Sequence, residues 1–162
     1  MKCPRCGGEV AVQRENYDYS SCGLPVTLVD VQVRTCPSCG EKGAAIPRIE
    51  ELHRAIAIAV SQKTARLSGD EVRFLRKFLG WSGADFARHI GVQPEVVSRW
   101  EKGRELIGAA NDRLLRLLVA NREPVSHYPE EVLESIEGEP RRTLVRAKVE
   151  RSRWLAETEA AA

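Results

Sequence analysis

Two copies of one short motif, C-P-x-C-G, constrain the fold of this chain more than any other feature of its sequence. These two knuckles run from Cys3 to Gly7 and from Cys36 to Gly40. Two cysteines three positions apart can direct both sulfurs at one ion if the turn between them is tight, and the proline helps to fix that turn. The following glycine permits a left-handed backbone conformation, so that backbone N–H groups can face the thiolates. Together the knuckles supply four sulfurs, the tetrahedral set that Zn²⁺ prefers.

We therefore predict a metal site whose ligands are Cys3, Cys6, Cys36 and Cys39. Four thiolates leave no open coordination position, so the predicted Zn²⁺ is structural rather than catalytic. Iron in a rubredoxin-like site, a redox-active dithiol and a pair of disulfides are the alternatives. The fifth cysteine, Cys22, is predicted to be a buried or half-buried small residue rather than a ligand.

The segment between the knuckles predicts a β-hairpin. Its 29 residues, 7–35, exceed the spacing of a usual zinc ribbon, which is about 15–20 residues. Val10–Gln13 and Pro25–Val33 both have the composition of extended strands. In the second of these, alternation predicts one face made of Val26, Leu28, Asp30 and Gln32 and an opposite face made of Val29, Val31 and Val33.

A helix is predicted over residues 46–62. Pro47 suits a first helical turn. Apolar residues then recur on one helical face, namely Ile49, Leu52, Ile56 and Val60. Residues 1–62 are thus expected to form a small, zinc-bound, β-rich lobe with a trailing helix. Such a lobe buries little core, so metal binding, about 10–16 kcal/mol in zinc-finger peptides, is expected to dominate its stability.

The rest of the chain divides into three parts. Residues 63–69 form a short polar linker, and residues 70–122 are a series of short helices with glycine breaks, which makes the predicted fold class α+β. Residues 123–162 form a charged C-terminal extension, acidic at first and arginine-rich over 141–153. Partial disorder, self-neutralisation, a second DNA contact and a helix that folds on binding are the alternatives for this extension.

Two helices within residues 70–122 form a candidate DNA-reading unit. Ser82 is a good N-cap for a helix over Gly83–Ile90, which a glycine turn connects to a second helix that opens at Pro94. Gly103 stops that second helix. One side of it is apolar, with Val97 and Trp100, and the other is polar, with Glu95, Ser98, Arg99 and Lys102.

A short helix, a glycine turn and a helix with a polar face are what reading of the DNA major groove requires. Arg99 can hold a guanine edge through two hydrogen bonds. The alternative is a plain three-helix bundle with a solvated face, in which Glu95 and Arg99 form a simple i, i+4 ion pair.

Residues 82–103 resemble the helix-turn-helix of the phage-repressor (Xre/Cro) family, above all in their ending V-S-R-W-E-K-G. That family often has glutamine just inside the first of the two helices, where it touches a phosphate, whereas this chain has Gly83. A backbone N–H at the helix N-terminus can replace that contact. The order of two C-P-x-C knuckles followed by this unit resembles the MqsA (YgiT-type zinc finger) antitoxin family over residues 1–122.

The resemblance implies a function in a toxin–antitoxin system. In that family the zinc lobe neutralises a partner toxin, commonly a ribonuclease, and the helical lobe dimerises and represses its own operon at a palindrome of double-stranded DNA. It implies that the four knuckle cysteines hold zinc and that the second helix of the unit reads DNA. The candidate DNA-binding residues are Glu95, Val96, Ser98, Arg99 and Lys102. MqsA has asparagine where this chain has Glu95, and an acid there prefers a cytosine amino group.

Other function classes find little support in the sequence. No catalytic triad, carboxylate pair or phosphate-binding glycine loop is recognisable, so we do not expect an enzyme. The longest apolar run, residues 55–60, is far shorter than a membrane span, which needs ~18 residues. The first residues have no apolar signal segment, so a cytoplasmic protein is expected. The net charge of +2 permits DNA binding without arguing for it.

The helix that follows the reading unit indicates self-association. It has more apolar surface than one buried face needs, which favours a homodimer contact through Leu114, Leu115, Leu117, Leu118 and Val119. Two other functions compete with the antitoxin hypothesis. One is a stand-alone zinc-containing Xre-family transcriptional regulator without a toxin, and the other is a redox switch that uses the knuckle thiols.

Overall fold

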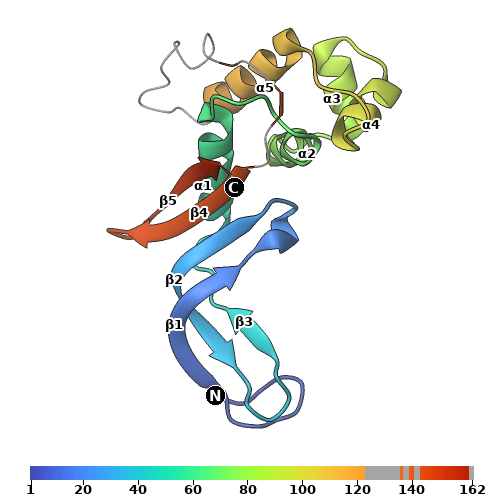
Figure 1. Ribbon diagram of the computed structural model, residues 1–162. Coiled ribbons are helices and arrows are strands. Elements are labelled where there is room, and N and C mark those ends of the chain that lie inside the picture. The colour runs from blue at the N-terminus through green and yellow to red at the C-terminus, as the bar shows by residue number, and fades with distance from the viewer. Residues whose placement is uncertain (123–135, 137–138, 141–142, 161–162) are drawn as a thin grey trace.

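The computed structural model describes residues 1–122, 136, 139–140 and 143–160. Its strands are β1 (Ala11–Asp18), β2 (Val26–Thr35), β3 (Lys42–Ala44), β4 (Thr143–Glu150) and β5 (Arg153–Ala160). Its helices are α1 (Ile49–Gln62), α2 (Gly69–Phe78), α3 (Gly83–Ile90), α4 (Pro94–Glu101) and α5 (Ala109–Arg122), with a 3₁₀ turn, η1, over Ser20–Cys22. The fold is α+β, as predicted. The first three strands lie at one end, α2 to α5 lie at the other, and α1 lies between them with β4 and β5 (Figure 1).

The C-terminal strands complete the N-terminal sheet. The sheet order is β1-β2-β4-β5, and β3 pairs with β2. β4 runs parallel to β2, with Val26 opposite Val145, and β5 returns antiparallel to β4. The sequence did not predict these strands: residues 143–160 belong to the extension for which disorder or a helix were the alternatives. The remainder of that extension, residues 123–135, 137–138, 141–142 and 161–162, lies outside the described residues.

The hairpin of β4 and β5 is amphipathic although its composition is charged. Val145, Ala147 and Trp154 are buried in the core, while Arg146 and Lys148 are exposed. This period-two alternation gives the strands their inner face. Charged residues on the outer face hide the pattern in the sequence. The two-residue turn, Arg151-Ser152, has positive φ at both positions. It lacks the Asn-Gly or Asp-Gly pair from which such a turn can be predicted.

A β-bulge in β2 corrects the predicted alternation. Asp30 adopts φ +53°, and the pairing of β1 with β2 shifts by one residue beside it. The buried face is therefore Val26, Leu28, Val31 and Val33, and the prediction that Asp30 and Gln32 share a face with Val26 and Leu28 is wrong. The bulge is held from β1: the Arg14 guanidinium donates to both Asp30 carboxylate oxygens at 3.1 Å and to its carbonyl oxygen at 2.7 Å. The extra residue also bends the strand.

α1 connects the two ends of the molecule through one continuous core. Leu52, Ile56 and Val60 are fully buried on the predicted face, whereas Ile49 at the helix start is 45% exposed. Against this helix lies Trp154 of β5, whose indole Nε1 donates to the Pro47 carbonyl oxygen at 2.9 Å. The core cluster extends from the inner face of the sheet through α1 into α2, α4 and α5.

The predicted polar linker is tied down on both sides. Helix α2 begins at Gly69, within the range expected for the linker, and the side chain of Ser68 caps it by accepting from the Glu71 N–H at 3.4 Å. Only glycine fits at position 69, because an added Cβ would lie 2.5 Å from the Trp100 carbonyl oxygen. The Leu67 N–H donates to the buried Asp112 carboxylate of α5 at 2.8 Å. The segment between α1 and α2 is therefore packed rather than free.

Candidate metal centre and the surface of helices α3 and α4

The two knuckles have the same backbone geometry. In the first, the Gly7 N–H donates to the Cys3 carbonyl oxygen at 2.9 Å, and in the second the Gly40 N–H donates to the Cys36 carbonyl oxygen at 2.9 Å. Both glycines have φ +73°, a conformation that a side chain would strain. The repeated motif thus folds into a repeated turn, and the sheet places the two turns face to face because β1 follows the first and β2 leads into the second.

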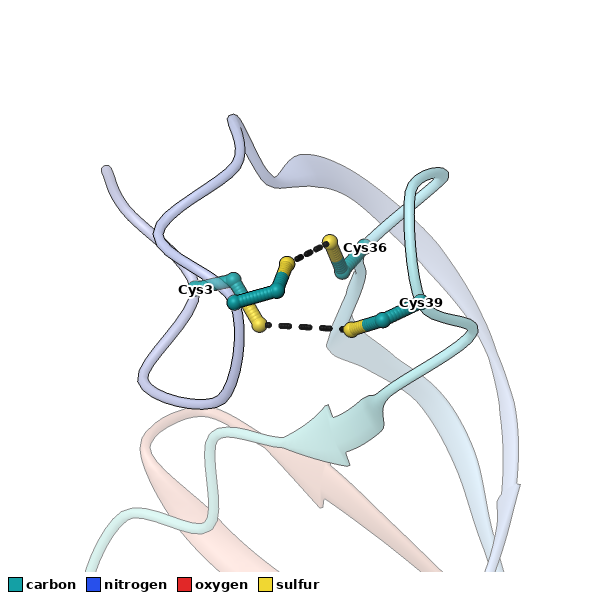
Figure 2. A group of neighbouring side chains, drawn as sticks. Cys3, Cys36 and Cys39 are labelled. Carbon is teal, nitrogen blue, oxygen red and sulfur yellow. Dashed lines mark hydrogen bonds between the residues drawn. The ribbon is translucent and has the colours of Figure 1, made fainter.

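The four predicted metal ligands come together at one point. Their sulfurs all lie within 4.8 Å of one another. The Cys3 and Cys39 sulfurs are 3.7 Å apart, and those of Cys6 and Cys36 are 3.5 Å apart. Figure 2 shows the side chains of the two knuckles pointing toward one another. A tetrahedral ion with bonds of about 2.3 Å to sulfur requires sulfur–sulfur edges of about 3.8 Å. All four cysteines are free, so the arrangement matches a metal cage and not the predicted alternative of two disulfides.

Hydrogen bonds at the cysteine cluster favour the thiolate form of Cys36. Burial opposes ionisation of Cys36, but the backbone N–H groups of Cys39 and Ser38 and the Cys6 thiol lower its pKa to about 6. At Cys39 the Glu41 N–H lowers the pKa, yet the neighbouring thiols and burial outweigh it and raise that pKa to about 12. Four adjacent thiols cannot all ionise without a cation between them. Metal binding at this cluster would therefore release protons.

Cys22 stands apart from this cluster. It is half-buried at the end of η1, and its thiol donates to the Leu24 carbonyl oxygen at 3.7 Å. Burial raises the pKa of this thiol. The placement agrees with the prediction of a half-buried residue that is not a ligand.

Helices α3 and α4 form the predicted short pair around a glycine turn. The Ser82 hydroxyl oxygen accepts from the Asp85 N–H at 3.1 Å, and the Asp85 carboxylate accepts from the Ser82 N–H at 3.1 Å, so α3 has a complete capping box. Gly91 ends α3 in the left-handed conformation, with φ +73°. Pro94 occupies the first turn of α4, and the N-cap residue, Gln93, makes no side-chain hydrogen bond to the helix.

Four of the five candidate DNA-binding residues share the outer side of α4, whereas Val96 packs against the core. Glu95, Arg99 and Lys102 are exposed, and Val96 and Ser98 are partly buried. The inner side of the helix, with Val97 and Trp100, is buried as predicted.

An ion-pair network that the sequence analysis missed fixes α4 against α2. Glu101 accepts from Arg76 Nε at 2.5 Å and from Arg73 Nε at 3.4 Å, and its side chain is 11% exposed. Arg76 also donates to the Trp81 carbonyl oxygen at 2.6 Å. The i, i+3 spacing of Arg73 and Arg76 was the only hint of this network in the sequence. It does not identify their shared partner, Glu101, which lies 25 to 28 residues away in the chain. This network holds the outer side of α4 in a defined orientation.

Helix α5 has apolar side chains on both of its faces. Leu115 and Val119 are buried in the core, while Leu114 and Leu117 are 39% and 44% exposed. Leu106, just before the helix, is 43% exposed as well. The excess of apolar surface noted in the sequence is thus present on the outside of the structure.

In the part of the chain that the structure describes, none of the helices has the length and hydrophobicity that a membrane span requires.

Comparison with known proteins identifies the family. A search of curated proteins found no match. The model of a family described as the antitoxin component of bacterial toxin–antitoxin system, MqsA, matches residues 1–127, which contain the cysteine cluster and helices α1 to α5. This match covers more than half of the 162 residues. The chain therefore belongs to the MqsA antitoxin family.

Proposed function

We propose that this antitoxin neutralises a partner toxin through its N-terminal lobe and represses its own operon by binding DNA through α3 and α4. The observation that carries the proposal is the family match over residues 1–127, which includes both the metal cluster and the helix pair. The chain itself is not an enzyme in this proposal, because the toxic chemistry, expected to be that of a ribonuclease, belongs to the partner.

The metal in this proposal is Zn²⁺ with a structural role. Four sulfur donors with edges of 3.5 and 3.7 Å suit a tetrahedral ion of this kind. When bound, the ion would cross-link the two knuckles through Cys3, Cys6, Cys36 and Cys39. Thiolate sites of this type persist in a reducing compartment, which supports the cytoplasm as the place of action.

The N-terminal lobe offers an edge on which a toxin can dock. β1 is the outermost strand on its side of the sheet, and most of its eight residues are exposed. An edge strand presents backbone N–H and carbonyl groups that can pair with a strand of another protein. The Val12 side chain, 51% exposed, adds an apolar contact on this strand.

Co-expression with the neighbouring gene product tests toxin binding. We expect a small protein to co-purify in a fixed stoichiometry with the full chain, with about one metal ion per chain by elemental mass spectrometry. We also expect this chain to relieve the growth arrest that the neighbour causes when it is expressed alone. A neighbour that neither binds nor arrests growth would favour a stand-alone zinc-containing regulator instead.

The outer side of α4 provides the DNA-reading surface in this proposal. A helix of a helix-turn-helix enters the major groove with its polar side chains toward the base edges. Glu95, Ser98, Arg99 and Lys102 occupy that side, and Val96 can contact a thymine methyl group. At Gly83, in the first turn of α3, backbone N–H groups take the place of a side-chain phosphate contact. This assignment makes α3 and α4 an Xre-type helix-turn-helix.

The exposed leucines and the proposed operator both support homodimerisation. Leu106, Leu114 and Leu117 are exposed apolar side chains that a second copy can cover. A two-fold dimer reads a palindrome whose half-site centres are about 10–10.5 base pairs apart, or a multiple of that distance.

Replacing Arg99 with alanine is expected to weaken operator binding by roughly 10–100-fold, because a bidentate contact to guanine contributes about 1–3 kcal/mol of discrimination. The measurement is fluorescence anisotropy with a duplex from the chain's own promoter region, after footprinting has located two half-sites. Arg5→Ala is the matched control, since Arg5 is an arginine that is 70% exposed at the opposite end of the molecule. Equal losses in both variants, or no promoter binding by the unaltered chain, would contradict the repressor proposal.

A further inference from the structure

We propose that Glu105 is a positioning residue for DNA recognition: it fixes the guanidinium of Arg99 so that the arginine reads a base rather than contacting any phosphate. The inference rests on the proposed DNA-binding function and deepens it. It concerns a residue outside α4, in the loop that leads to α5.

The carboxylate and the guanidinium are in direct contact. Arg99 Nε donates to Glu105 Oε2 at 2.7 Å. The alternative to DNA reading paired Arg99 with Glu95, one helical turn earlier, but among the described residues the ion pair is made with Glu105. The identity of the partner matters because Glu95 would pull the arginine back along the helix, whereas Glu105 approaches from the loop beyond the helix end.

The loop is built to bring Glu105 back to the helix. Gly103 has φ +66° and its N–H donates to the Trp100 carbonyl oxygen at 3.0 Å. The next N–H, that of Arg104, donates to the Arg99 carbonyl oxygen at 2.9 Å. These two bonds form a helix C-terminal turn that fixes the direction of the chain at residue 105. The contact therefore depends on ordered backbone and not only on two long side chains.

The contact leaves the base-reading atoms of the arginine available. Glu105 engages Nε, and within the part of the chain that the structure describes no hydrogen bond to either terminal Nη of Arg99 is present. The two Nη groups form the fork that can donate to guanine O6 and N7. A carboxylate on Nε fixes the plane of that fork before DNA arrives. Preorganisation of this kind favours the partner that fits the fixed geometry.

The same carboxylate acts against unspecific contacts. Arg99 and Glu105 are 48% and 47% exposed, so the pair adds little to folding stability. The pair instead affects DNA binding, because a phosphate that approached Arg99 from the loop side would meet the negative charge of Glu105. Repulsion of the wrong partner is a common source of specificity. Glu105 thus lowers affinity for DNA in general while it preserves affinity for the correct sequence.

The test measures the ratio of affinities for two duplexes. One duplex is selected by the unaltered, metal-loaded full chain from a randomised pool, and the other has the same composition in scrambled order. In Glu105→Ala we expect this ratio to fall by about tenfold, the value of one well-placed base contact, with tighter binding of the scrambled duplex. In Glu105→Gln we expect a smaller fall, because the amide oxygen can still accept from Arg99 Nε.

Two controls separate positioning from charge alone. Glu159→Ala removes an acid that is 52% exposed in an ion pair with Arg146 on the C-terminal hairpin, and we expect it to leave the ratio unchanged. In an Arg99→Ala background, Glu105→Ala should also leave the ratio unchanged. If Glu105→Ala changes both affinities by the same factor, or lowers the ratio equally without Arg99, the positioning role is overturned. If the unaltered chain prefers no duplex, the proposed DNA-binding function fails first, and this inference fails with it.

Discussion

Replacing Cys36 with serine should release the metal and unfold the knuckle end of the N-terminal lobe while the helices remain folded. In residues 1–10 and 34–45 the only buried side chains are those of Cys3 and Cys36, two of the four proposed metal ligands. No apolar core exists there to hold the two turns together without an ion. Metal binding contributes about 10–16 kcal/mol in zinc-finger peptides, far more than the local hydrogen bonds can supply. The rest of the chain has a core of its own that extends from Val26 to Val119 and includes the C-terminal strands.

Metal content and amide hydrogen exchange together check this prediction. We expect Cys36→Ser to lose bound metal and to lose protection at the amides of both knuckles, with protection in α2 to α5 retained. A chelator added to the unaltered chain should have the same effect. Cys22→Ser is the matched control, because Cys22 is outside the cluster and should keep the metal. Knuckle amides that stay protected after metal loss would show that packing, and not the ion, maintains this end of the lobe.

The features that the sequence predicted well are those encoded locally. The knuckles needed only the spacing of cysteine, proline and glycine, and each folds into a turn closed by its own backbone hydrogen bonds. The α3–α4 pair likewise has its cap at Ser82, its turn at Gly91 and its buried side at Val97 and Trp100 within about 20 residues. Short-range chemistry of this kind can be predicted from residue types alone.

The features that the sequence did not predict depend on partners far away in the chain. Arg14 of the neighbouring strand holds the bulge at Asp30. Because of this bulge, the residues of β2 beyond Asp30 point to the opposite face of the sheet from the one predicted. Pairing of β4 with β2 joins residues more than 100 positions apart. Glu105 reaches Arg99 only because the loop turns back, whereas the helical period pointed to Glu95. The bulge and the Arg99–Glu105 contact each override a local pattern, whereas no local pattern predicted the strands of the C-terminal hairpin.

The C-terminal hairpin lies beyond the family match and links the two ends of the molecule. The match ends at residue 127, and β4 begins at Thr143. The Thr143 hydroxyl donates to the Glu71 carboxylate of α2 at 3.2 Å, and Glu71 also accepts from Lys63 Nζ at 2.6 Å. Lys63 and Glu71 have side chains only 3% and 4% exposed. Removing either partner of such a buried ion pair destabilises the fold, because the other charge is left buried and unpaired. The contacts among Lys63, Glu71 and Thr143 hold the sheet, α1 and α2 in one arrangement.

A second buried pair, beside the first, gives the largest expected loss of stability from a single substitution outside the metal site. Arg116 Nε donates to Asp112 Oδ1 at 2.6 Å, and both side chains are 0% exposed. The guanidinium also donates to the carbonyl oxygens of Ser61 at 3.1 Å and Ala65 at 2.8 Å, and to that of Lys63. These carbonyls belong to the last turn of α1 and to the residues that follow it, where no further helical turn can satisfy them. One arginine side chain thus hydrogen-bonds the backbone at the end of α1 and in the segment that leads to α2.

Arg116→Met should therefore lower the free energy of unfolding by about 3–5 kcal/mol, because it leaves the Asp112 carboxylate buried without its cation and removes the guanidinium donor from three carbonyl groups. Urea denaturation followed by far-ultraviolet circular dichroism measures this change. Arg113→Met makes the same chemical change on the exposed side of α5 and should alter stability by no more than about 0.5 kcal/mol. Adding Asp112→Leu to Arg116→Met should recover part of the loss, since the unpaired charge is then removed. If the double variant is no more stable than Arg116→Met alone, the carbonyl groups, and not the ion pair, account for the effect of Arg116.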